Sequence, residues 1–511
     1  MNNADDIIKK LENSLMTVNV SPKTQNIGVV EKVMDNIVIA SGLSKAKMGE
    51  EVLFNDGTPG LILNLDEDEV GIVLLGKTEK LEEGGIVKTT GNILSVRAHE
   101  DLLGRVINPV GLPLDGKAAV KSGKAMPLER IAAGVIERQP VDTPMKTGIT
   151  AIDALFPIGR GQRELIIGDR GLGKTAIAID TIINQKKNND KAKKSNGGKR
   201  LLCVYVAIGQ KQSTVAQVIE KLRETGALDY TIIVAANAAD QVSLQYLAPY
   251  AGIAIAEYFL EKGEDVLIVY DDLTKHAWAY RQISLVLKRP AGREAYPGDI
   301  FYLHSRLLER AVRLNKNFGG GSITALPVIE TQADDISAYI PTNVISITDG
   351  QIFLKSDLFN AGVRPAIDVG LSVSRVGGAA QTGAMKSVAG RIKLELAQYK
   401  ELAIFAQFGS ELDQATLNQL ERGKRLTEIL KQPQYSPLSE AEEILSIWSV
   451  TNGFTDDIKV EEIQKFEKAY RQYVATHEKK LIETLSSGAK LDEKTIESLK
   501  KVTVSFKKTF S

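Results

Sequence analysis

The segment 164–175 reads Glu-Leu-Ile-Ile-Gly-Asp-Arg-Gly-Leu-Gly-Lys-Thr, an apolar run followed by the pattern G-x-x-x-x-G-K-[ST]. A helical segment, 176–180, leaves it. This order of strand, loop and helix predicts a phosphate-binding loop, because its glycines let backbone N–H groups surround a polyphosphate. Lys174 would supply a positive charge to the outer phosphates, and the Thr175 hydroxyl can hold Mg²⁺. A glycine-rich turn without a ligand is the alternative, but the complete motif in this context favours nucleotide binding.

A second nucleotide-binding element, of the Walker B form, is expected at Asp265–Asp271, where an apolar run ends in an acid. A continuous apolar run is typical of a buried parallel strand, and an acid at its carboxyl end faces the ligand crevice. Alone this is a weak signal, but it follows the loop by about 95 residues. We expect Asp271 to hold Mg²⁺ through water, opposite Thr175.

The strand expected at Leu201–Ile208 runs into Gly-Gln-Lys, which places Gln210 at the same edge. In RecA-like nucleotide hydrolases this edge usually carries a glutamate that activates the attacking water. An amide cannot accept the proton of that water at neutral pH, although it can orient the water. Gln210 therefore argues against fast turnover at this site without forbidding hydrolysis.

Arg375 ends a short strand, 369–375, and is followed by Val-Gly-Gly. An arginine in such a place is accessible and could reach a neighbouring subunit. Arginine fingers stabilise the charge that develops in phosphoryl transfer and change its rate by roughly 10³–10⁵. From the residues alone, a structural salt bridge remains the stronger interpretation of Arg375.

Composition narrows the function classes. The chain has 511 residues with 64 Lys plus Arg and 64 Asp plus Glu, so its formal net charge is zero and gives no electrostatic footprint for nucleic acid. The single cysteine, Cys203, cannot form an internal disulfide, which suits a reducing compartment. Four scattered histidines disfavour a histidine metal site. We also expect no signal peptide in residues 1–20 and no membrane span.

The pattern of expected secondary structure changes twice along the chain. Short β-rich pieces with Gly, Asn and Asp turns, from Gln25 to about Thr90, predict a small β-barrel. Residues 91–375 alternate between strands and helices, which predicts an α/β domain with a mostly parallel sheet. Its polar stretch Lys186–Arg200 is expected to be a solvated loop. The strands expected in this domain are Leu165–Ile167, Leu201–Ile208, Tyr230–Ala235, Val266–Tyr270 and Ser322–Val328.

Helical periodicity dominates after Arg375. A helix is expected from Ile392 until Gly409 stops it, and further helices are expected at 411–430, 438–448, 460–485 and 492–509. At the other end, an amphipathic helix is expected at 6–18. It is interpreted equally well as a surface helix or as a helix that docks a partner.

These segments together resemble the alpha subunits of F-type ATP synthases, and the resemblance covers nearly the whole chain. The stretches that carry it are 159–170 (Gly-Arg-Gly-Gln-Arg-Glu-Leu-Ile-Ile-Gly-Asp-Arg), 207–211 (Ala-Ile-Gly-Gln-Lys), 290–299, 301–310, 340–350 and 370–377 (Gly-Leu-Ser-Val-Ser-Arg-Val-Gly). The resemblance implies a β-barrel, a central RecA-like phosphate-binding-loop domain and a C-terminal helical bundle. The implied domains are an N-terminal helix or arm at 1–23, the barrel at 24–94, the RecA-like domain at 95–378 and the helical domain at 379–511.

The same resemblance implies partner subunits, and it implies different roles for this chain and for the beta subunits. Three such chains and three beta subunits would form a ring around a rotating gamma shaft, with a delta or peripheral-stalk subunit at the N-terminal helix. The chain would bind ATP or ADP with Mg²⁺ at a low-turnover site, while Arg375, supported by Ser372, reaches the catalytic site of a neighbouring beta subunit. We expect a peripheral position on the cytoplasmic side of the cell membrane, no nucleic-acid partner and contact with the membrane only through the complex.

The residues implied to surround the nucleotide belong to the loop, the sheet edge and two later segments, and Thr175 and Asp271 would serve the Mg²⁺. They are Gly168, Asp169, Arg170, Gly171, Leu172, Gly173, Lys174, Thr175, Gln210, Asp271, Arg364, Gln432 and Gln434. The two glutamines are expected to meet the edge of the adenine base, with a plain Pro-flanked turn as the alternative.

Three residues at two places depart from the family pattern. Gly171-Leu172 stand where the family usually has Gln-Thr, which weakens the expected contacts near the phosphates. Asp368 stands where the family usually has Asn.

Three functions stay open from the sequence. The first is a finger-donating subunit of a rotary ATP synthase or of a related membrane-associated machine. The second is a self-sufficient hexameric ATPase, and the third is a structural subunit that no longer holds nucleotide. Whether protons or sodium are coupled is decided in other subunits.

Overall fold

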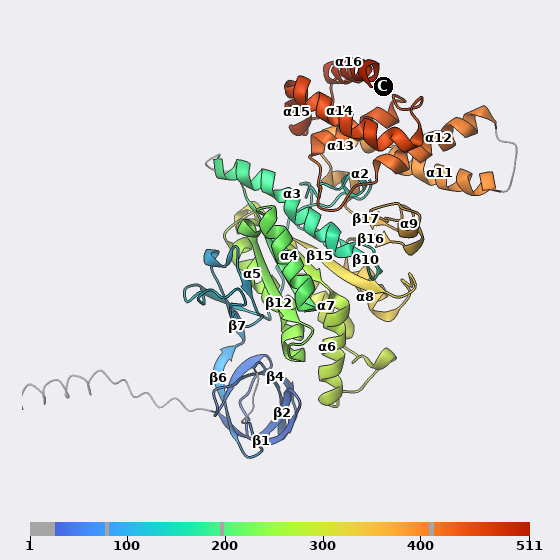
Figure 1. The fold of residues 1–511 in the computed structure, drawn as a ribbon. Coiled ribbons are helices and arrows are strands. Elements are labelled where there is room, and N and C mark those ends of the chain that lie inside the picture. The colour runs from blue at the N-terminus through green and yellow to red at the C-terminus, as the bar shows by residue number, and fades with distance from the viewer. Residues whose placement is uncertain (1–25, 77–80, 195–198, 408–412, 511) are drawn as a thin grey trace, which may run out of the picture. The chain divides into compact units, whose positions relative to one another are not determined.

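A computed structural model describes residues 26–76, 81–194, 199–407 and 413–510. The chain divides into two compact units, one ending at Leu94 and one beginning at Ser95 (Figure 1). The expected N-terminal arm, with its helix at 6–18, lies outside the described residues.

The first unit is a closed barrel whose strands follow the order β1-β2-β5-β4-β3-β6. Its strands are β1 Ile27–Met34, β2 Ile37–Ser41, β3 Glu50–Phe54, β4 Pro59–Leu65, β5 Glu69–Leu74 and β6 Ile86–Ile93. Closure pairs every strand on both sides and leaves no open sheet edge. Alternate side chains such as Val30, Val52 and Ile72 point inward and form the core, so the predicted small β-barrel is confirmed.

The second unit is built on a sheet with the strand order β17-β16-β10-β15-β13-β11-β12-β8, and β14 pairs with β15. Its strands are β8 Val106–Ile107, β10 Leu165–Asp169, β11 Leu201–Gln210, β12 Thr231–Asn237, β13 Asp265–Asp271, β14 Val312–Arg313, β15 Ser322–Thr331, β16 Gly350–Leu354 and β17 Val373–Ser374. Only β14 and β17 run antiparallel to their neighbours. A separate ribbon pairs β7 (Ser95–Ala98) with β9 (Lys124–Pro127). The predicted mostly parallel sheet and its strands are confirmed.

Helices connect and cover these strands, as crossovers between parallel strands require. They are α2 Thr150–Leu155, α3 Lys174–Lys194, α4 Gln212–Glu224, α5 Val242–Glu261, α6 Leu273–Val286, α7 Ile300–Leu308, α8 Tyr339–Ile347 and α9 Ser356–Asn360. The helix α5 is apolar almost all round, because it packs on β11, β12 and β13 and also contacts α6. The helix α3 contacts β10, β11, β13 and β15.

The C-terminal part of the described chain is helical. Its helices are α10 Gly383–Ala389, α11 Ile392–Gln407, α12 Gln414–Ile429, α13 Glu440–Thr451, α14 Ile463–His477, α15 Lys479–Ser486 and α16 Glu493–Thr509. The helix α13 is the centre of the group, since it contacts α10, α12, α14 and α15. The predicted helical region is confirmed, while the stop expected at Gly409 lies outside the described residues.

Two expectations about local structure were wrong. The loop expected at Lys186–Arg200 is helical as far as Lys194, because the buried Asn189 exchanges two hydrogen bonds with the backbone of Leu201, each 2.8 Å, and anchors the helix. The single helix expected at 460–485 breaks at Glu478, whose backbone (φ −128°, ψ 53°) is not helical. The break lets α14 and α15 both pack on α13.

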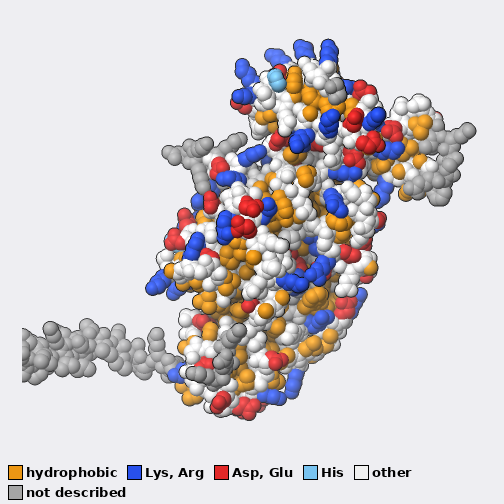
Figure 2. All heavy atoms as spheres, in the orientation of Figure 1, with side chains coloured by type: hydrophobic (Ala, Val, Ile, Leu, Met, Phe, Trp, Pro, Cys, Tyr) orange, Lys and Arg blue, Asp and Glu red, His pale blue; other side chains and the backbone are white. Residues whose placement is uncertain are grey.

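Charges of both signs are interspersed over the face drawn in Figure 2, which suits the zero formal net charge. Basic side chains gather over the C-terminal helices in this view, and α16 alone carries five lysines. None of the helices in the described ranges combines the length and the apolar character needed to cross a membrane.

Candidate nucleotide-binding site

The loop between β10 and α3 has the backbone shape that its glycines predict. Gly171 and Gly173 have φ values of +85° and +98°, a left-handed conformation that glycine adopts without strain. A Cβ atom at Gly171 would meet nothing within 4 Å, so the requirement there is conformational and not one of space. The loop leads directly into the positive N-terminal end of α3, which favours an anion.

Lys174 lies inside this loop and is only 8% exposed. Its Nζ donates to the backbone carbonyls of Gly168 and Asp169, both at 2.6 Å. Burial lowers the pKa of this ammonium group, and nearby carboxylates, Glu330 first, act in the opposite direction. No described carboxylate forms an ion pair with Lys174, so its charge is buried with backbone partners only. That arrangement fits a polyanion bound over the loop.

The carboxyl ends of β10, β11 and β13 bring the other expected phosphate-side residues together. The Thr175 hydroxyl donates to Asp271 Oδ2 at 2.7 Å, and Gln210 Nε2 donates to Asp271 Oδ1 at 3.0 Å. Burial raises the pKa of Asp271, and the adjacent Asp272 raises it further. A hydroxyl and a carboxylate in contact are the hard oxygen donors that Mg²⁺ prefers, so these residues fit the ion.

Tyr205 was missed by the sequence reasoning, although it belongs to the same cluster. Its phenol donates to Asp271 Oδ2 at 2.7 Å from the strand β11. The one feature of the sequence that could have indicated it is the hydroxyl of this tyrosine within the otherwise apolar strand Leu-Leu-Cys-Val-Tyr-Val-Ala-Ile. The contact orients the Asp271 carboxylate toward Thr175.

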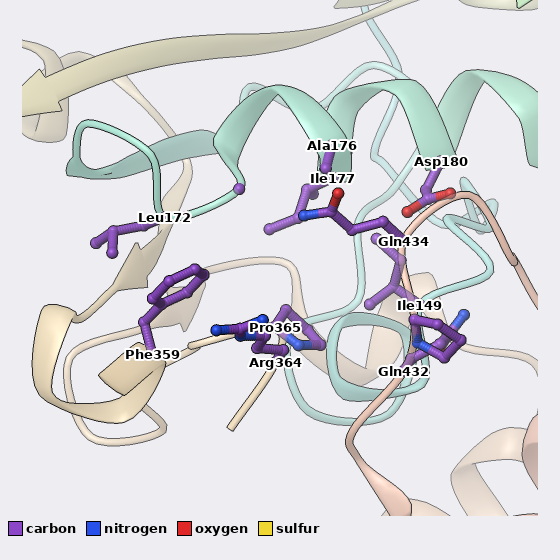
Figure 3. Close-up of a pocket in the computed structure, with 12 residues that line it drawn as sticks. Ile149, Leu172, Ala176, Ile177, Asp180, Phe359, Arg364, Pro365, Gln432 and Gln434 are labelled. Carbon is purple, nitrogen blue, oxygen red and sulfur yellow. The ribbon is translucent and has the colours of Figure 1, made fainter. Parts of the chain in front are cut away.

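The loop residues between Gly168 and Gly173 differ in their surroundings. Asp169 Oδ1 accepts hydrogen bonds from Thr331 Oγ1 at 2.6 Å and from the Asp334 backbone at 3.0 Å, so it fastens the loop to β15. Arg170 is exposed. Leu172 is 8% exposed, and its side chain extends toward Phe359 (Figure 3). The leucine that departs from the family pattern therefore builds an apolar wall.

A pocket of about 430 Å³, open to solvent, continues from the loop along α3. Figure 3 shows α3 on one side of it, the segment from Phe359 to Pro365 on the other, and the segment from Gln432 to Gln434 at the end away from Leu172. Its lining is formed by Ile149, Leu172, Gly173, Ala176, Ile177, Asp180, Phe359, Arg364, Pro365, Gln432, Pro433 and Gln434. Apolar walls with a few polar groups at one end suit a flat heterocycle. Arg364 stacks on the Phe359 ring at 4.2 Å.

The two expected base-edge glutamines have different environments. The Gln432 amide is bound to the protein: Nε2 donates to Gly148 O at 2.7 Å, and Oε1 accepts from Thr150 N at 3.1 Å. The Gln434 side chain is exposed and makes no hydrogen bond with the described residues. Only Gln434 is therefore available to a ligand without breaking a protein contact.

Asp180 is a lining residue that the sequence reasoning did not select. It is 5% exposed, and its Oδ1 has no hydrogen-bond partner among the described residues. Burial raises the pKa of Asp180 to about 6, although a hydrogen bond from the Tyr435 backbone opposes the shift. The sequence signal was its place four residues after Ala176, on the same face of α3.

Arg375 does not join this site. Ser374 pairs with Gly350, the first residue of β16, and β16 runs parallel to β10. Arg375 therefore lies at the amino-terminal edge of the sheet, whereas the loop and Asp271 lie at the carboxyl-terminal edge. Its side chain is exposed, and within the described ranges its guanidinium forms no ion pair. The salt bridge that the residues alone favoured is absent from that part of the chain.

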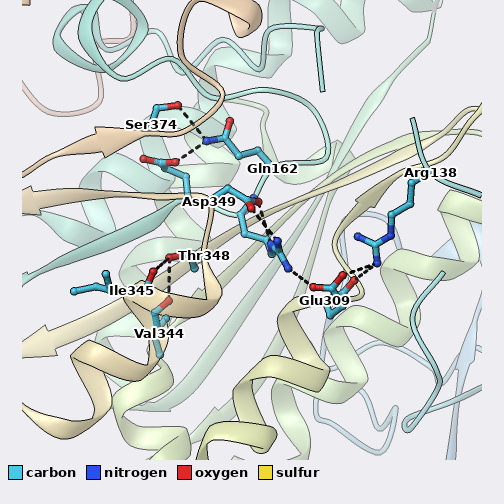
Figure 4. A network of polar contacts seen from close by, with 10 residues as sticks. Arg138, Gln162, Glu309, Val344, Ile345, Thr348, Asp349 and Ser374 are labelled. Atoms are coloured by element: carbon cyan, nitrogen blue, oxygen red, sulfur yellow. Dashed lines mark hydrogen bonds and ion pairs between the residues drawn. The ribbon is translucent and has the colours of Figure 1, made fainter. Parts of the chain in front are cut away.

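The strand before Arg375 is held by a polar network (Figure 4). The buried Ser372 hydroxyl accepts from Phe353 N at 3.0 Å, and Ser374 Oγ donates to Pro157 O at 2.7 Å. The backbone of Arg375 donates to Asp349 O at 2.9 Å, and the Asp349 carboxylate is bound by Arg163, whose guanidinium also pairs with Glu309. The backbone that carries Arg375 is thus fixed while its side chain is free to reach outward.

Comparison with known proteins finds a matching family for three parts of the chain and a similar protein over most of its length. Residues 23–91 match the beta-barrel domain of the ATP synthase alpha/beta family, residues 148–374 its nucleotide-binding domain, and residues 381–506 its C-terminal domain. The ATP synthase subunit alpha of Syntrophomonas wolfei subsp. wolfei (strain DSM 2245B / Goettingen) is 56% identical over 490 residues. These residues are 96% of this chain and 95% of that relative.

Proposed function

Because this chain belongs to the ATP synthase alpha/beta family, we propose that it is the alpha-type, finger-donating subunit of a rotary ATP synthase. It binds MgATP at its own low-turnover site and supplies Arg375 to the catalytic site of an adjacent beta subunit. The observation that carries the proposal is the placement of Arg375 at the sheet edge opposite its own phosphate-binding loop. An arginine there points away from the nucleotide site of its own chain, which leaves it available to a nucleotide held by another chain.

The groups around the loop support binding without fast hydrolysis. Lys174 and the N-terminal end of α3 bind the phosphates, while Thr175 and Asp271 hold the Mg²⁺. When bound, the ion neutralises charge on the phosphate oxygens. Gln210 cannot accept a proton from water, and its amide already donates to Asp271. The site therefore positions nucleotide, while the end of β11 offers an amide in place of a general base.

Arg375 acts in the neighbouring site. A guanidinium presented from a fixed backbone stabilises the charge on the transferring phosphoryl group, and its backbone is held by Ser372, Ser374 and Asp349. The proposed partners are three beta subunits that alternate with three copies of this chain, a gamma shaft and a peripheral-stalk subunit at the N-terminal arm. The complex would couple ATP synthesis or hydrolysis to ion transport, with this subunit at the cytoplasmic side of the cell membrane.

Co-purification and turnover test the proposal. The full chain should purify with a beta-type partner in equal amounts, and Arg375→Ala should lower ATP turnover of the assembled ring by roughly 10³-fold or more while its own nucleotide binding persists. Arg223→Ala is the matched control, because Arg223 is an exposed arginine of α4 whose ion pair within the described ranges is with Glu220 of the same helix. Turnover that survives Arg375→Ala would refute the finger assignment.

The isolated chain gives a second measurement. Purified alone, it should bind MgATP but hydrolyse it very slowly. Brisk hydrolysis by the single chain would favour a self-sufficient hexameric ATPase. Failure to bind a fluorescent ATP analogue with Mg²⁺ would favour a purely structural subunit.

A further inference from the structure

Asp180 lies deep in the pocket that continues from the phosphate-binding loop. It is one turn beyond Ala176 on α3, which places it about 6 Å farther from the phosphate-binding end of the helix. Its carboxylate points under α3 beside the segment that carries Gln434 (Figure 3). This end of the pocket is where the base of a nucleotide would lie if its phosphates occupied the loop.

The polar groups at this end are few. Asp180 Oδ1 is buried and has no hydrogen-bond partner among the described residues. Gln434 offers an amide that can donate or accept. Arg364, the other charged residue in the lining, is stacked on Phe359. A buried carboxylate oxygen without a partner is costly, and an ionised carboxylate can only accept hydrogen bonds. The pocket therefore favours a ligand that brings a donor to Asp180.

Purine bases differ in this respect at one position. Adenine carries an amino group at C6, which donates, whereas hypoxanthine and guanine carry an oxygen there, which accepts. Facing Asp180, the amino group gains a charge-assisted hydrogen bond, while the oxygen faces a carboxylate and leaves both acceptors unpaired.

We propose that Asp180 is the residue that selects 6-aminopurine over 6-oxopurine nucleotides in this pocket. The proposal rests on the proposed nucleotide binding and deepens it. A hydrogen bond to a charged group changes a dissociation constant by roughly ten- to a hundredfold, so ATP should bind at least about tenfold more tightly than inosine triphosphate.

The test is a competition titration on the purified full-length chain with Mg²⁺ and a fluorescent ATP analogue. Three competitors are compared: ATP, inosine triphosphate and purine riboside triphosphate, which has no group at C6. The wild type should bind ATP most tightly, the purine riboside nucleotide less tightly and inosine triphosphate least tightly. In Asp180→Asn the amide can turn its NH₂ toward a 6-oxygen, so the ratio of ATP to inosine triphosphate affinity should shrink to about two- or threefold. Asp190→Asn is the matched control, because Asp190 lies on the same helix with its side chain 47% exposed, and its ratio should equal that of the wild type.

Each outcome decides the proposal. It is overturned if folded Asp180→Asn keeps the full ratio, or if wild-type protein binds ATP and inosine triphosphate equally, and in both cases nucleotide binding itself stands. It is also overturned if purine riboside triphosphate binds as tightly as ATP, a measurement that needs no variant and holds even if Asp180→Asn does not fold. Wild-type protein that binds none of the three refutes the proposed function, and this inference with it.

Discussion

At the scale of the residue, the two glutamines of the pocket differ in the hydrogen bonds that their side chains make. Gln432 and Gln434 are two positions apart, yet Gln432 accepts from Thr150 N, the first residue of α2, whose N-terminus has no other side-chain cap. Gln434 faces the pocket, and its amide makes no hydrogen bond with any residue of the described ranges. The difference comes from what each amide already touches.

The first prediction separates these two glutamines. Gln432→Ala leaves the Thr150 N–H without its partner and removes one of the two donors to the Gly148 carbonyl, which keeps the Leu438 N–H. The melting temperature without nucleotide should therefore fall by an amount that reflects about 1–3 kcal/mol. Gln434→Ala should leave the melting temperature unchanged and weaken ATP binding about three- to tenfold. Thermal unfolding and competition titration of both variants provide the check. Equal melting temperatures for the two variants would contradict the assignment.

The second prediction concerns pH. Because burial raises the pKa of Asp180 to about 6, its carboxylate is ionised above that pH and neutral below it. A neutral carboxyl can donate to a 6-oxygen, so the preference for ATP over inosine triphosphate should be complete above about pH 7 and shrink as pH falls through 6. Dissociation constants measured at pH 7.5, 6 and 5 provide the check. A ratio that stays constant across this range in the wild type, or that varies equally in Asp180→Asn, would contradict the prediction.

At the scale of the element, the short strand β17 decides where Arg375 is presented. It pairs with β16 over only two positions, so its place depends on side-chain bonds as well as on the backbone. Ser372, fully buried before the strand, accepts from Phe353 N, and Ser374 bonds Pro157. Arg163 and Asp349 hold the turn before β16.

The third prediction tests this support. Ser372→Ala leaves the Phe353 N–H buried without a partner, so we expect a loss of about 1–3 kcal/mol of stability. Turnover of the assembled ring should fall, but less than with Arg375→Ala, because the guanidinium is misplaced and not removed. Ser305→Ala, a change to a half-buried hydroxyl that donates to Tyr302 O within α7, is the control. Ring turnover equal to that of the wild type would show that Ser372 does not position the finger.

The fourth prediction concerns Asp368, which stands where the family usually has Asn. Its Oδ1 accepts from the backbones of Gly370 and Leu371 at 2.8 and 2.9 Å, and Oδ2 pairs with Lys400 of α11 at 3.1 Å. Asp368→Asn keeps the first two bonds and loses an ion pair whose lysine is 61% exposed, so stability should change by no more than about 1 kcal/mol. Asp368→Ala removes all three bonds and should cost clearly more. Thermal unfolding of the two variants distinguishes these cases, and equal losses would contradict the assignment.

At the scale of the whole molecule, the chain consists of two units that fold around separate cores. The first unit is a closed barrel with its own apolar interior, and the second contains the nucleotide pocket with lining residues from both its sheet-based and its helical parts. The pocket therefore joins segments as distant in sequence as Ile149 and Gln434. A ligand that fills this pocket would contact both parts of the second unit at once.

The fifth prediction is that residues 24–94 fold on their own. Closure leaves no unpaired strand edge, and side chains from all six strands fill the interior. The fragment should show a β-type circular dichroism spectrum and a cooperative thermal transition. An extended, non-cooperative fragment would mean that the barrel needs the rest of the chain.

The phosphate-binding loop, the strands on either side of it and the order of fold types were all predictable from sequence. These features are local: a glycine conformation, an apolar run or a helical period depends on neighbours a few positions away. Where a local pattern was ambiguous, prediction failed. The polar stretch from Lys186 continues α3 only because Asn189 meets Leu201 across the turn.

The sequence by itself determined that the chain has a phosphate-binding loop between a strand and a helix, and it predicted which residues would surround the phosphates. Only the tertiary structure decided three further points. Among the described residues the Gln432 amide is bound to the protein and the Gln434 amide is not, Asp180 is buried in the pocket beyond the loop, and Arg375 lies at the opposite edge of the sheet. The physical reason is the same in each case. Burial and hydrogen bonding depend on groups brought together by folding, and Thr150 and Gln432 meet across 282 positions of chain.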